Sequence, residues 1–163
     1  MLARVSNVAR VTVGVISDTH GLLRPEALAA LDGCEHLIHA GDVGSPHILE
    51  QLRALAPTTA VRGNVDIASW ATALPLTDVV EVGSLQVYVL HDLAALDVDP
   101  RAAGFSAVIS GHTHRPAADV RNGVLYLNPG SAGPRRFKLP IALARLEVVG
   151  DHLSHRIIEL VHT

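Results

Sequence analysis

The sequence predicts a single α/β domain in which a parallel sheet is faced by a second, more antiparallel set of strands. Strand and helix patterns alternate up to residue 61, and hairpin patterns replace them after residue 70. Apolar residues make up 48% of the 163 residues, which is enough to bury one ordinary core. We therefore expect one domain over residues 11–163, preceded by an N-terminal extension over residues 1–10 that could be disordered.

The first half of the chain has the pattern of parallel strands joined by crossover helices. Residues 11–16 form a nearly continuous β-branched run, which is typical of a strand buried on both faces. A helix is predicted over residues 25–31, and a second begins after Ser45, an N-cap residue followed by proline. Short apolar strands at residues 37–38 and 58–61 complete the alternation, which predicts a parallel sheet.

The second half of the chain has the pattern of hairpins. Asn122-Gly123 between two apolar runs is the strongest short hairpin signal, and a short helix is predicted after Pro100. The strand segments are residues 78–82, 85–90, 108–109, 119–120, 124–127, 141–149 and 153–160. These segments predict the second, more antiparallel set of strands.

Charge and composition exclude several function classes. The net charge is −3, and without a basic patch neither nucleic acid nor an anionic membrane is expected as a partner. Cys34 is the single cysteine, so one chain can form neither a disulfide framework nor a thiolate metal cage. No signal peptide or membrane span is visible, and we expect a cytoplasmic protein. A homo-oligomer is compatible with the sequence.

Polar side chains that can bind metal follow five of the predicted strands. Because the carboxyl ends of parallel strands line one edge of a sheet, we expect these side chains to meet there. In extended backbone, two histidines two residues apart would point to the same side, and Gly111 before them would let another group approach the backbone. Each residue alone is more often a turn or surface residue. The candidate ligands are Asp18, His20, Asp42, Asn64, His91, His112 and His114.

Seven oxygen and nitrogen ligands could hold two divalent ions if one carboxylate bridges them. With four imidazoles and no thiolate, Mn²⁺ is the preferred ion, and Fe, Zn²⁺ or Ni²⁺ are alternatives. Two ions bring four positive charges, of which Asp18, Asp42 and a bridging hydroxide remove three. The remaining charge favours an anionic substrate such as a phosphoryl group.

Five motifs occur in order along the chain. They are Asp18-Thr19-His20, Gly41-Asp42, Gly63-Asn64, His91 and Gly111-His112-Thr113-His114. In this order they resemble the calcineurin-like metallophosphoesterase superfamily, and Asn128 to Ser131 adds a likeness to its small single-domain phosphodiesterase branch. The resemblance covers roughly residues 11–160. It implies two packed mixed β-sheets, a β-sandwich, flanked by helices.

The resemblance also implies a ligand set and a reaction. The first ion would be held by Asp18, His20, Asp42 and His114, with Asp42 as a bridge to a second ion held also by Asn64, His91 and His112. The implied reaction is phosphodiester hydrolysis, by in-line attack of a metal-bridging hydroxide on a small anionic phosphoester. No further catalytic residue is assigned.

One departure from the family concerns the leaving group. The larger phosphatases of the family have a histidine directly after the Gly-Asn pair, where this chain has Val65. Asp66 is nearby but would have to be protonated to act as an acid. We therefore expect a preference for good leaving groups, such as those of aryl phosphodiesters.

Three further positions have alternative interpretations. Asp92 follows His91 where the family usually has glycine, and it could orient that histidine or repel an anionic substrate. His39 could support the ligands from behind or be a packed core histidine. Arg135-Arg136 could contact a phosphate, but a solvated basic pair is the favoured interpretation.

The alternative to an enzyme is a non-catalytic scaffold or protein-interaction module on the same fold. The family includes an endosomal-coat (retromer) subunit that has lost metal ligands and serves as an interaction surface. This chain keeps all four histidines and both aspartates of the implied ligand set, which favours the enzyme.

Overall fold

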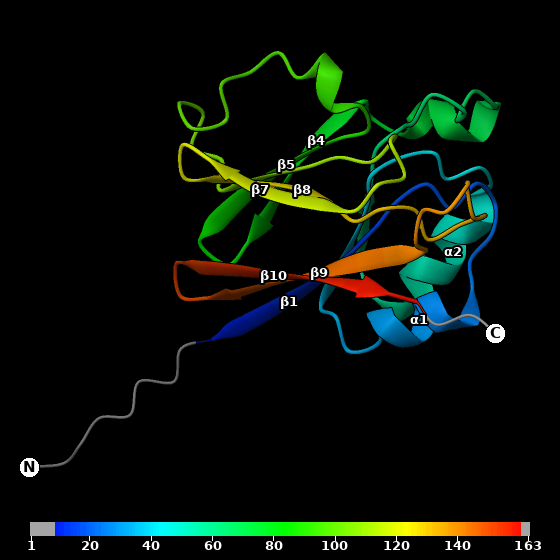
Figure 1. Cartoon of the computed structure of the whole chain (residues 1–163), viewed down its shortest axis with the longest axis horizontal. Helices are drawn as coiled ribbons and strands as arrows, with labels where there is room; N and C mark the ends of the chain where they lie inside the picture. Colours follow the sequence, from blue (N-terminus) through cyan, green and yellow to red (C-terminus); the bar gives the residue numbers. More distant parts are fainter. Residues whose placement is uncertain (1–8, 161–163) are drawn as a thin grey trace, which may run out of the picture.

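Two five-stranded β-sheets pack face to face, and two α-helices cover the outer face of one of them (Figure 1). The computed structural model describes residues 9–160. Sheet A has the strand order β10-β9-β1-β2-β3, and sheet B has the order β4-β5-β6-β8-β7. Both sheets contain parallel and antiparallel neighbours, so the predicted fold of two packed mixed sheets is confirmed.

Sheet A contains the predicted parallel unit. Its elements are β1 (Arg10–Ile16), α1 (Pro25–Leu31), β2 (His36–His39), α2 (Pro46–Leu55), β3 (Thr58–Ala60), β9 (Ala142–Val149) and β10 (His152–Glu159). β1, β2 and β3 are parallel and joined by the two helices, as predicted. The last hairpin joins this sheet because β9 pairs antiparallel with β1. Of the helices described over residues 9–160, none has the length and apolar character needed to cross a membrane.

Sheet B is built from two hairpins around a central parallel strand. Its strands are β4 (Thr77–Val82), β5 (Leu85–Leu90), β6 (Ala107–Ile109), β7 (Ala117–Arg121) and β8 (Val124–Asn128). The two predicted hairpins, β4–β5 and β7–β8, are confirmed, and β6 lies between them parallel to β5 and β8. Asn122 and Gly123 have φ values of 51° and 78°, as a two-residue hairpin turn with two left-handed residues requires.

Some local predictions differ from the structure. The segment after Pro100 forms hydrogen-bonded turns, not a helix, and Gly104 has a φ of 85° that ends any helical run. The 3₁₀ helices η1 (Ser69–Ala73) and η2 (Leu93–Ala95) were not predicted. Residues 1–8 of the predicted N-terminal extension lie outside the described residues, and Arg10 already belongs to β1.

The core is aliphatic, as the composition predicts. Alternation along β1 places Val13 and Val15 between the sheets and Ile16 against the helices. Among the Phe, Tyr and Trp side chains of residues 9–160, only Tyr88 is buried. This packing fixes both sheets so that the carboxyl ends of β1, β2, β3, β5 and β6 reach one common edge.

Candidate metal centre

All seven predicted ligands lie at this edge, in loops that follow strands of both sheets. Sheet A supplies four of them, after β1, β2 and β3, and sheet B supplies three, after β5 and β6. Six form two groups whose ligand atoms lie within 4.8 Å of one another, namely Asp18, His20 and His114, and Asp42, His91 and His112. Asn64 adjoins the second group.

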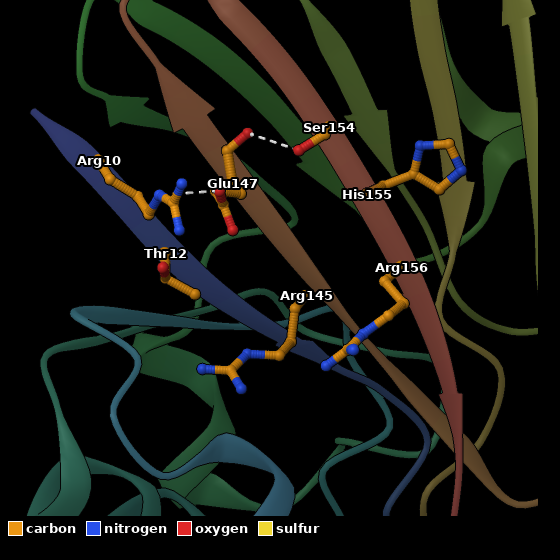
Figure 2. Close-up of a pocket in the computed structure, with 7 residues that line it drawn as sticks. All are labelled: Arg10, Thr12, Arg145, Glu147, Ser154, His155 and Arg156. Carbon is orange, nitrogen blue, oxygen red and sulfur yellow. Dashed lines mark hydrogen bonds and ion pairs between the residues drawn. The ribbon is translucent and has the colours of Figure 1, made fainter. Parts of the chain in front are cut away.

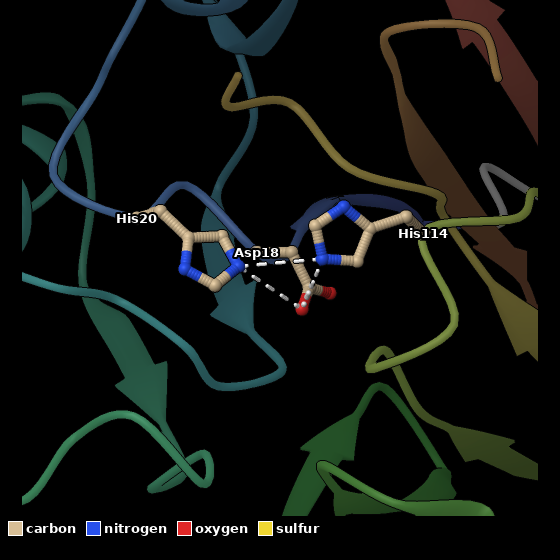
Figure 3. Close-up of side chains that lie close together, drawn as sticks. All are labelled: Asp18, His20 and His114. Carbon is tan, nitrogen blue, oxygen red and sulfur yellow. Dashed lines mark hydrogen bonds and ion pairs between the residues drawn. The ribbon is translucent and has the colours of Figure 1, made fainter. Parts of the chain in front are cut away.

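The first group surrounds one buried carboxylate oxygen of Asp18 (Figure 3). Asp18 Oδ2 accepts hydrogen bonds from Ser17 Oγ at 2.6 Å and from the backbone N–H of His112 at 3.1 Å. Asp18 Oδ1 has no hydrogen-bond partner within the described chain, yet it lies 3.3 Å from His114 Nε2 and 3.8 Å from His20 Nε2. The two ring nitrogens are 3.3 Å apart. Three lone-pair atoms thus converge, as ligands of a divalent cation do.

The second group contains acceptor atoms that face one another. His91 Nδ1 lies 2.7 Å from the carbonyl oxygen of Ala40, so in the neutral ring Nδ1 carries the proton and Nε2 carries the lone pair. His91 Nε2 is 2.9 Å from Asn64 Oδ1 and 3.3 Å from Asp42 Oδ2. Asn64 Oδ1 is also 3.1 Å from His112 Nδ1. Such converging lone pairs need a proton or a metal ion between them.

The electrostatics of the second group favour positive charge. Burial alone lowers the pKa of His91, but the Asp42 carboxylate, the Ala40 carbonyl and the Asp18 charge outweigh it, so that the pKa of His91 is raised. Burial alone raises the pKa of Asp42, but His91, the backbone N–H of Val65 and the His20 ring outweigh it, so that the pKa of Asp42 is lowered. Positive charge beside the Asp42 carboxylate is therefore stabilised.

Asp42 lies between the two groups. Its Oδ2 is 3.3 Å from His91 Nε2 in the second group and 3.7 Å from His20 Nε2 in the first. Its Oδ1 accepts a hydrogen bond from the backbone N–H of Val65 at 3.0 Å, which fixes the carboxylate plane. A carboxylate that bridges two ions would have to lie at this position.

Five of the seven predicted ligands have left-handed backbone. The φ values are 55°, 47°, 55°, 72° and 61° for Asp18, His20, Asp42, His112 and His114. Non-glycine residues adopt this conformation rarely, at a cost of about 1–3 kcal/mol each. The predicted extended backbone across His112 and His114 is therefore wrong. The turn sends the ring of His112 to the second group and that of His114 to the first.

Two glycines let the loops approach the ligand carboxylates. A Cβ atom on Gly111 would clash with Ser17 Oγ and Asp18 Oδ2, and one on Gly63 would clash with the backbone nitrogen and Oδ1 of Asp42. The close approach predicted at Gly111 is confirmed, and the approaching group is the Asp18 carboxylate. Asp18 and Asp42 thus each lie directly against a glycine backbone that carries no side chain.

His39 lies behind the ligands and joins the loops after β1 and β2. Its Nδ1 accepts a hydrogen bond from the N–H of Gly41 at 3.1 Å, so its Nε2–H donates to Thr19 Oγ1 at 2.9 Å. The Thr19 hydroxyl donates in turn to the carbonyl of Val43 at 2.9 Å. Burial lowers the pKa of His39 to about 4, so the ring is neutral at pH 7. His39 positions two ligand loops and is itself no ligand.

Asp66 also joins ligand loops. Its Oδ2 accepts hydrogen bonds from the N–H groups of Val43 at 3.1 Å and Gly63 at 2.9 Å, and its Oδ1 accepts one from Gly44 at 3.0 Å. The side chain is buried, and both oxygens face donors, so it has no orientation in which to give a proton to a substrate. Asp66 ties the loop after β2 to the loop after β3.

Asp92 lies beside His112 and does not orient His91. Its Oδ1 accepts a hydrogen bond from the N–H of Ala94 at 3.0 Å, which caps η2, and its Oδ2 is 4.0 Å from His112 Nε2. The group that orients His91 is the carbonyl of Ala40. Of the two interpretations of Asp92, the orienting one is therefore not supported by the geometry.

The Asn-Pro-Gly-Ser loop supports both groups, a role that sequence reasoning missed. The Asn128 amide donates hydrogen bonds to the carbonyl of Gly111 at 2.8 Å and to Thr113 Oγ1 at 3.1 Å. Ser131 Oγ donates to the carbonyl of Asp18 at 2.9 Å. The available signal was the position of these polar residues directly after a predicted strand.

Arg136 borders the first group. Burial lowers the pKa of His114, Asp18 raises it, and the charges of Arg136 and His20 bring the net pKa below its ordinary value. Arg136 is exposed, as expected of a solvated residue. The charge of Arg136 therefore acts on a buried residue of the first group.

A cleft of about 380 Å³ adjoins the second group. The ligands at one end of it are Asn64, His91 and His112, and its apolar wall includes Leu76, Leu90 and Ala95. Apolar walls with a few convergent polar groups are typical of small-molecule sites. The structure thus places two candidate metal-ligand groups at one edge of the fold, beside a cleft.

The chain belongs to the calcineurin-like phosphoesterase superfamily, whose domain model matches residues 11–151. A probable metallophosphoesterase of Methanothermobacter thermautotrophicus is 35% identical over 162 residues, which cover 90% of this chain and 91% of the relative. A phosphodiesterase of Methanocaldococcus jannaschii is 27% identical over 137 residues, with coverages of 72% and 82%. The structure of vacuolar protein sorting 29 from Cryptosporidium parvum shares the fold, with a TM-score of 0.74, 20% identity and coverages of 94% and 99%.

Proposed function

We propose that this protein is a dinuclear metal-dependent phosphodiesterase that hydrolyses a small anionic phosphoester. The observation that carries the proposal is the convergence of lone pairs at the strand ends. Asp18 Oδ1 faces the imidazoles of the first group, and Asn64 Oδ1 faces those of the second. The phosphodiesterase of Methanocaldococcus jannaschii supports the same reaction class.

The donor set fits two divalent transition-metal ions. With Asp42 shared, the first ion would be held by Asp18, His20 and His114, and the second by Asn64, His91 and His112. Four imidazoles with carboxylate and amide oxygens suit Mn²⁺ best, and Fe, Zn²⁺ and Ni²⁺ are alternatives. When bound, the ions would supply positive charge for the phosphoryl oxygens and lower the pKa of a water molecule that attacks phosphorus.

Residues around the ligands would bind and orient the ester. Arg136 would contact a phosphoryl oxygen on the side of the first group, because its charge already reaches His114. The cleft beside the second group would take an organic substituent against Leu76 and Leu90. A diester, which carries organic groups on both sides of phosphorus, suits this arrangement better than inorganic phosphate does.

The side chains that follow the Gly63-Asn64 pair favour substrates with good leaving groups. Val65 has no titratable atom, and the oxygens of Asp66 are both occupied by backbone donors. Neither residue could protonate a departing alkoxide. We therefore propose faster turnover of aryl phosphodiesters than of alkyl esters.

Hydrolysis of bis(p-nitrophenyl) phosphate with added Mn²⁺ tests the proposal. Asp42→Asn and His112→Ala should each abolish turnover and reduce bound metal, while circular dichroism shows an intact fold. His47→Ala is the matched control, because His47 is exposed on α2, and it should behave as wild type. Turnover that survives both ligand substitutions would refute the proposed site.

The alternative function, a non-catalytic scaffold, has the fold likeness to vacuolar protein sorting 29 in its favour. At 20% identity this likeness concerns the fold alone. The enzyme is favoured because all seven side chains are present and converge. A purified protein that neither binds Mn²⁺ nor hydrolyses the aryl diester would favour the scaffold.

A further inference from the structure

A second polar depression lies at the other end of sheet A, on the face that carries the helices (Figure 2). It has a volume of about 340 Å³. The residues that line it include Arg10 and Thr12 of β1, Arg145 and Glu147 of β9, and Ser154 and Arg156 of β10. Asp18 lies six positions after Thr12 along β1 and the loop that follows it, so the depression lies about 20 Å from the candidate metal centre.

Two arginines face each other across neighbouring strands of this depression. Arg145 is directly opposite Arg156 in the β9–β10 register, and Figure 2 shows both side chains leaving the same side of the sheet. Like charges at directly opposite positions destabilise a strand pair. Two positive charges thus lie close together, although the chain as a whole has a net charge of −3.

The acidic residue of the depression does not neutralise this pair. Glu147 Oε1 is paired with Arg10 Nε at 3.0 Å. Over residues 9–160, no carboxylate lies within 4.0 Å of the guanidinium of Arg145 or Arg156. Arg145 donates one long hydrogen bond of 3.4 Å to the carbonyl of Asp32 and also lies beside the thiol of Cys34. A guanidinium has five N–H groups, so several remain available to an anion. The lining residues include three arginines and one glutamate, which together carry a net charge of about +2. One further carboxylate lies at the margin, because Glu35 Oε2 accepts a hydrogen bond from the backbone N–H of Thr12 at 3.0 Å.

We infer that this depression is a second anion site, which binds a phosphate group, free or carried on a small molecule. One dianion would match the charges of the Arg145 and Arg156 guanidiniums, which have no carboxylate partner in the described part of the chain. Each planar guanidinium can donate two parallel hydrogen bonds to phosphate oxygens. The hydroxyl of Thr12 lines the same space as a further donor, and the hydroxyl of Ser154, which makes only a long bond of 3.5 Å to the carbonyl of Glu147, could turn to the anion. A bound dianion would also remove the repulsion between Arg145 and Arg156. The inference does not depend on the proposed catalytic function.

Calorimetric titration of the full-length protein with inorganic phosphate and with glycerol phosphate tests this site. The titrations are run at matched ionic strength, on protein as purified and again after chelation, so that binding at the metal centre is recognised by its loss. Wild type should bind in both conditions, and Arg156→Gln should weaken that binding at least about tenfold. Arg156→Lys keeps the positive charge but loses the paired N–H donors of the guanidinium, so it should weaken phosphate binding less than Arg156→Gln does.

Arg53→Gln is the matched control, since Arg53 is exposed on α2 outside the depression, and it should bind phosphate as wild type does. Arg156→Gln should also raise the thermal midpoint in phosphate-free buffer, because it removes a like-charge contact. Tighter binding of glycerol phosphate would identify a phosphorylated small molecule, and tighter binding of inorganic phosphate would identify the free ion. Equal binding by wild type and Arg156→Gln, or tighter binding of a polyglutamate peptide than of either phosphate, would overturn the inference.

Discussion

His39 should make the fold sensitive to acid. Its pKa falls from 6.5 to about 4 in the folded protein because the ring is buried. Since the unfolded chain binds the proton more tightly, this contribution to stability is complete above pH 6.5 and is lost as the pH falls towards 4. Between pH 7 and pH 4.5, protonation of this one ring should lower the free energy of unfolding by about 2 kcal/mol.

The substitution His39→Gln tests this prediction because it removes the titrating ring. Its amide N–H could still donate to Thr19 Oγ1, but the acceptor for the N–H of Gly41 is lost. The variant should therefore be less stable than wild type at pH 7, by about 1–3 kcal/mol. As the pH falls to 4.5, wild type loses the His39 contribution and the variant does not, so the difference in their free energies of unfolding should narrow by about 2 kcal/mol.

Urea unfolding followed by circular dichroism, at pH values from 7 to 4.5, measures this gap. Both proteins are stripped of metal in the same way, so that the pH dependence of metal binding cancels in the difference. His155→Gln serves as the control, because His155 is exposed on β10, and it should follow the wild-type curve. Parallel curves for wild type and His39→Gln would refute the assignment of a neutral, buried His39.

Three further predictions concern the ligand loops and the substrate. Asp66→Asn would place an amide N–H donor against backbone N–H donors, so the free energy of unfolding measured in urea should fall by about 1–3 kcal/mol, and the protein should bind less metal. The control is Asp119→Asn on exposed β7, which should change the free energy of unfolding by less than about 1 kcal/mol. Arg136→Ala should raise KM for the aryl diester about tenfold with little change in kcat, because the cation would contact ground and transition states alike; an unchanged KM would exclude substrate contact. Val65→His should raise turnover of alkyl relative to aryl esters in parallel rate assays, and an unaltered ratio would contradict the leaving-group argument.

The ligand positions could be predicted because strand direction places them without any knowledge of side-chain geometry. Apolar runs locate the strands, and the crossover helices make β1, β2 and β3 parallel. The residues that follow them, such as Asp18 and Asp42, must then share an edge. The Asn122-Gly123 turn was predictable for a related reason, because its conformation is determined locally by its own two residues.

The details that could not be predicted depend on contacts between distant residues. The left-handed backbone of His112 is held by a hydrogen bond to Asp18, 94 positions away. His39 contacts Thr19, 20 positions away, and Asn128 contacts Gly111, 17 positions away. A periodicity pattern describes neighbours along the chain only, so it carries no information about these pairs.

The two candidate ligand groups are each divided between the two sheets, and this division would set an order of assembly. In the first group, Asp18 and His20 follow β1 of sheet A, whereas His114 follows β6 of sheet B. An ion could be bound by a whole group only after the sheets have closed on each other, so metal uptake would be a late event in folding. A bound ion would then resist separation of the sheets at this edge, and the availability of metal would set how long the closed form persists.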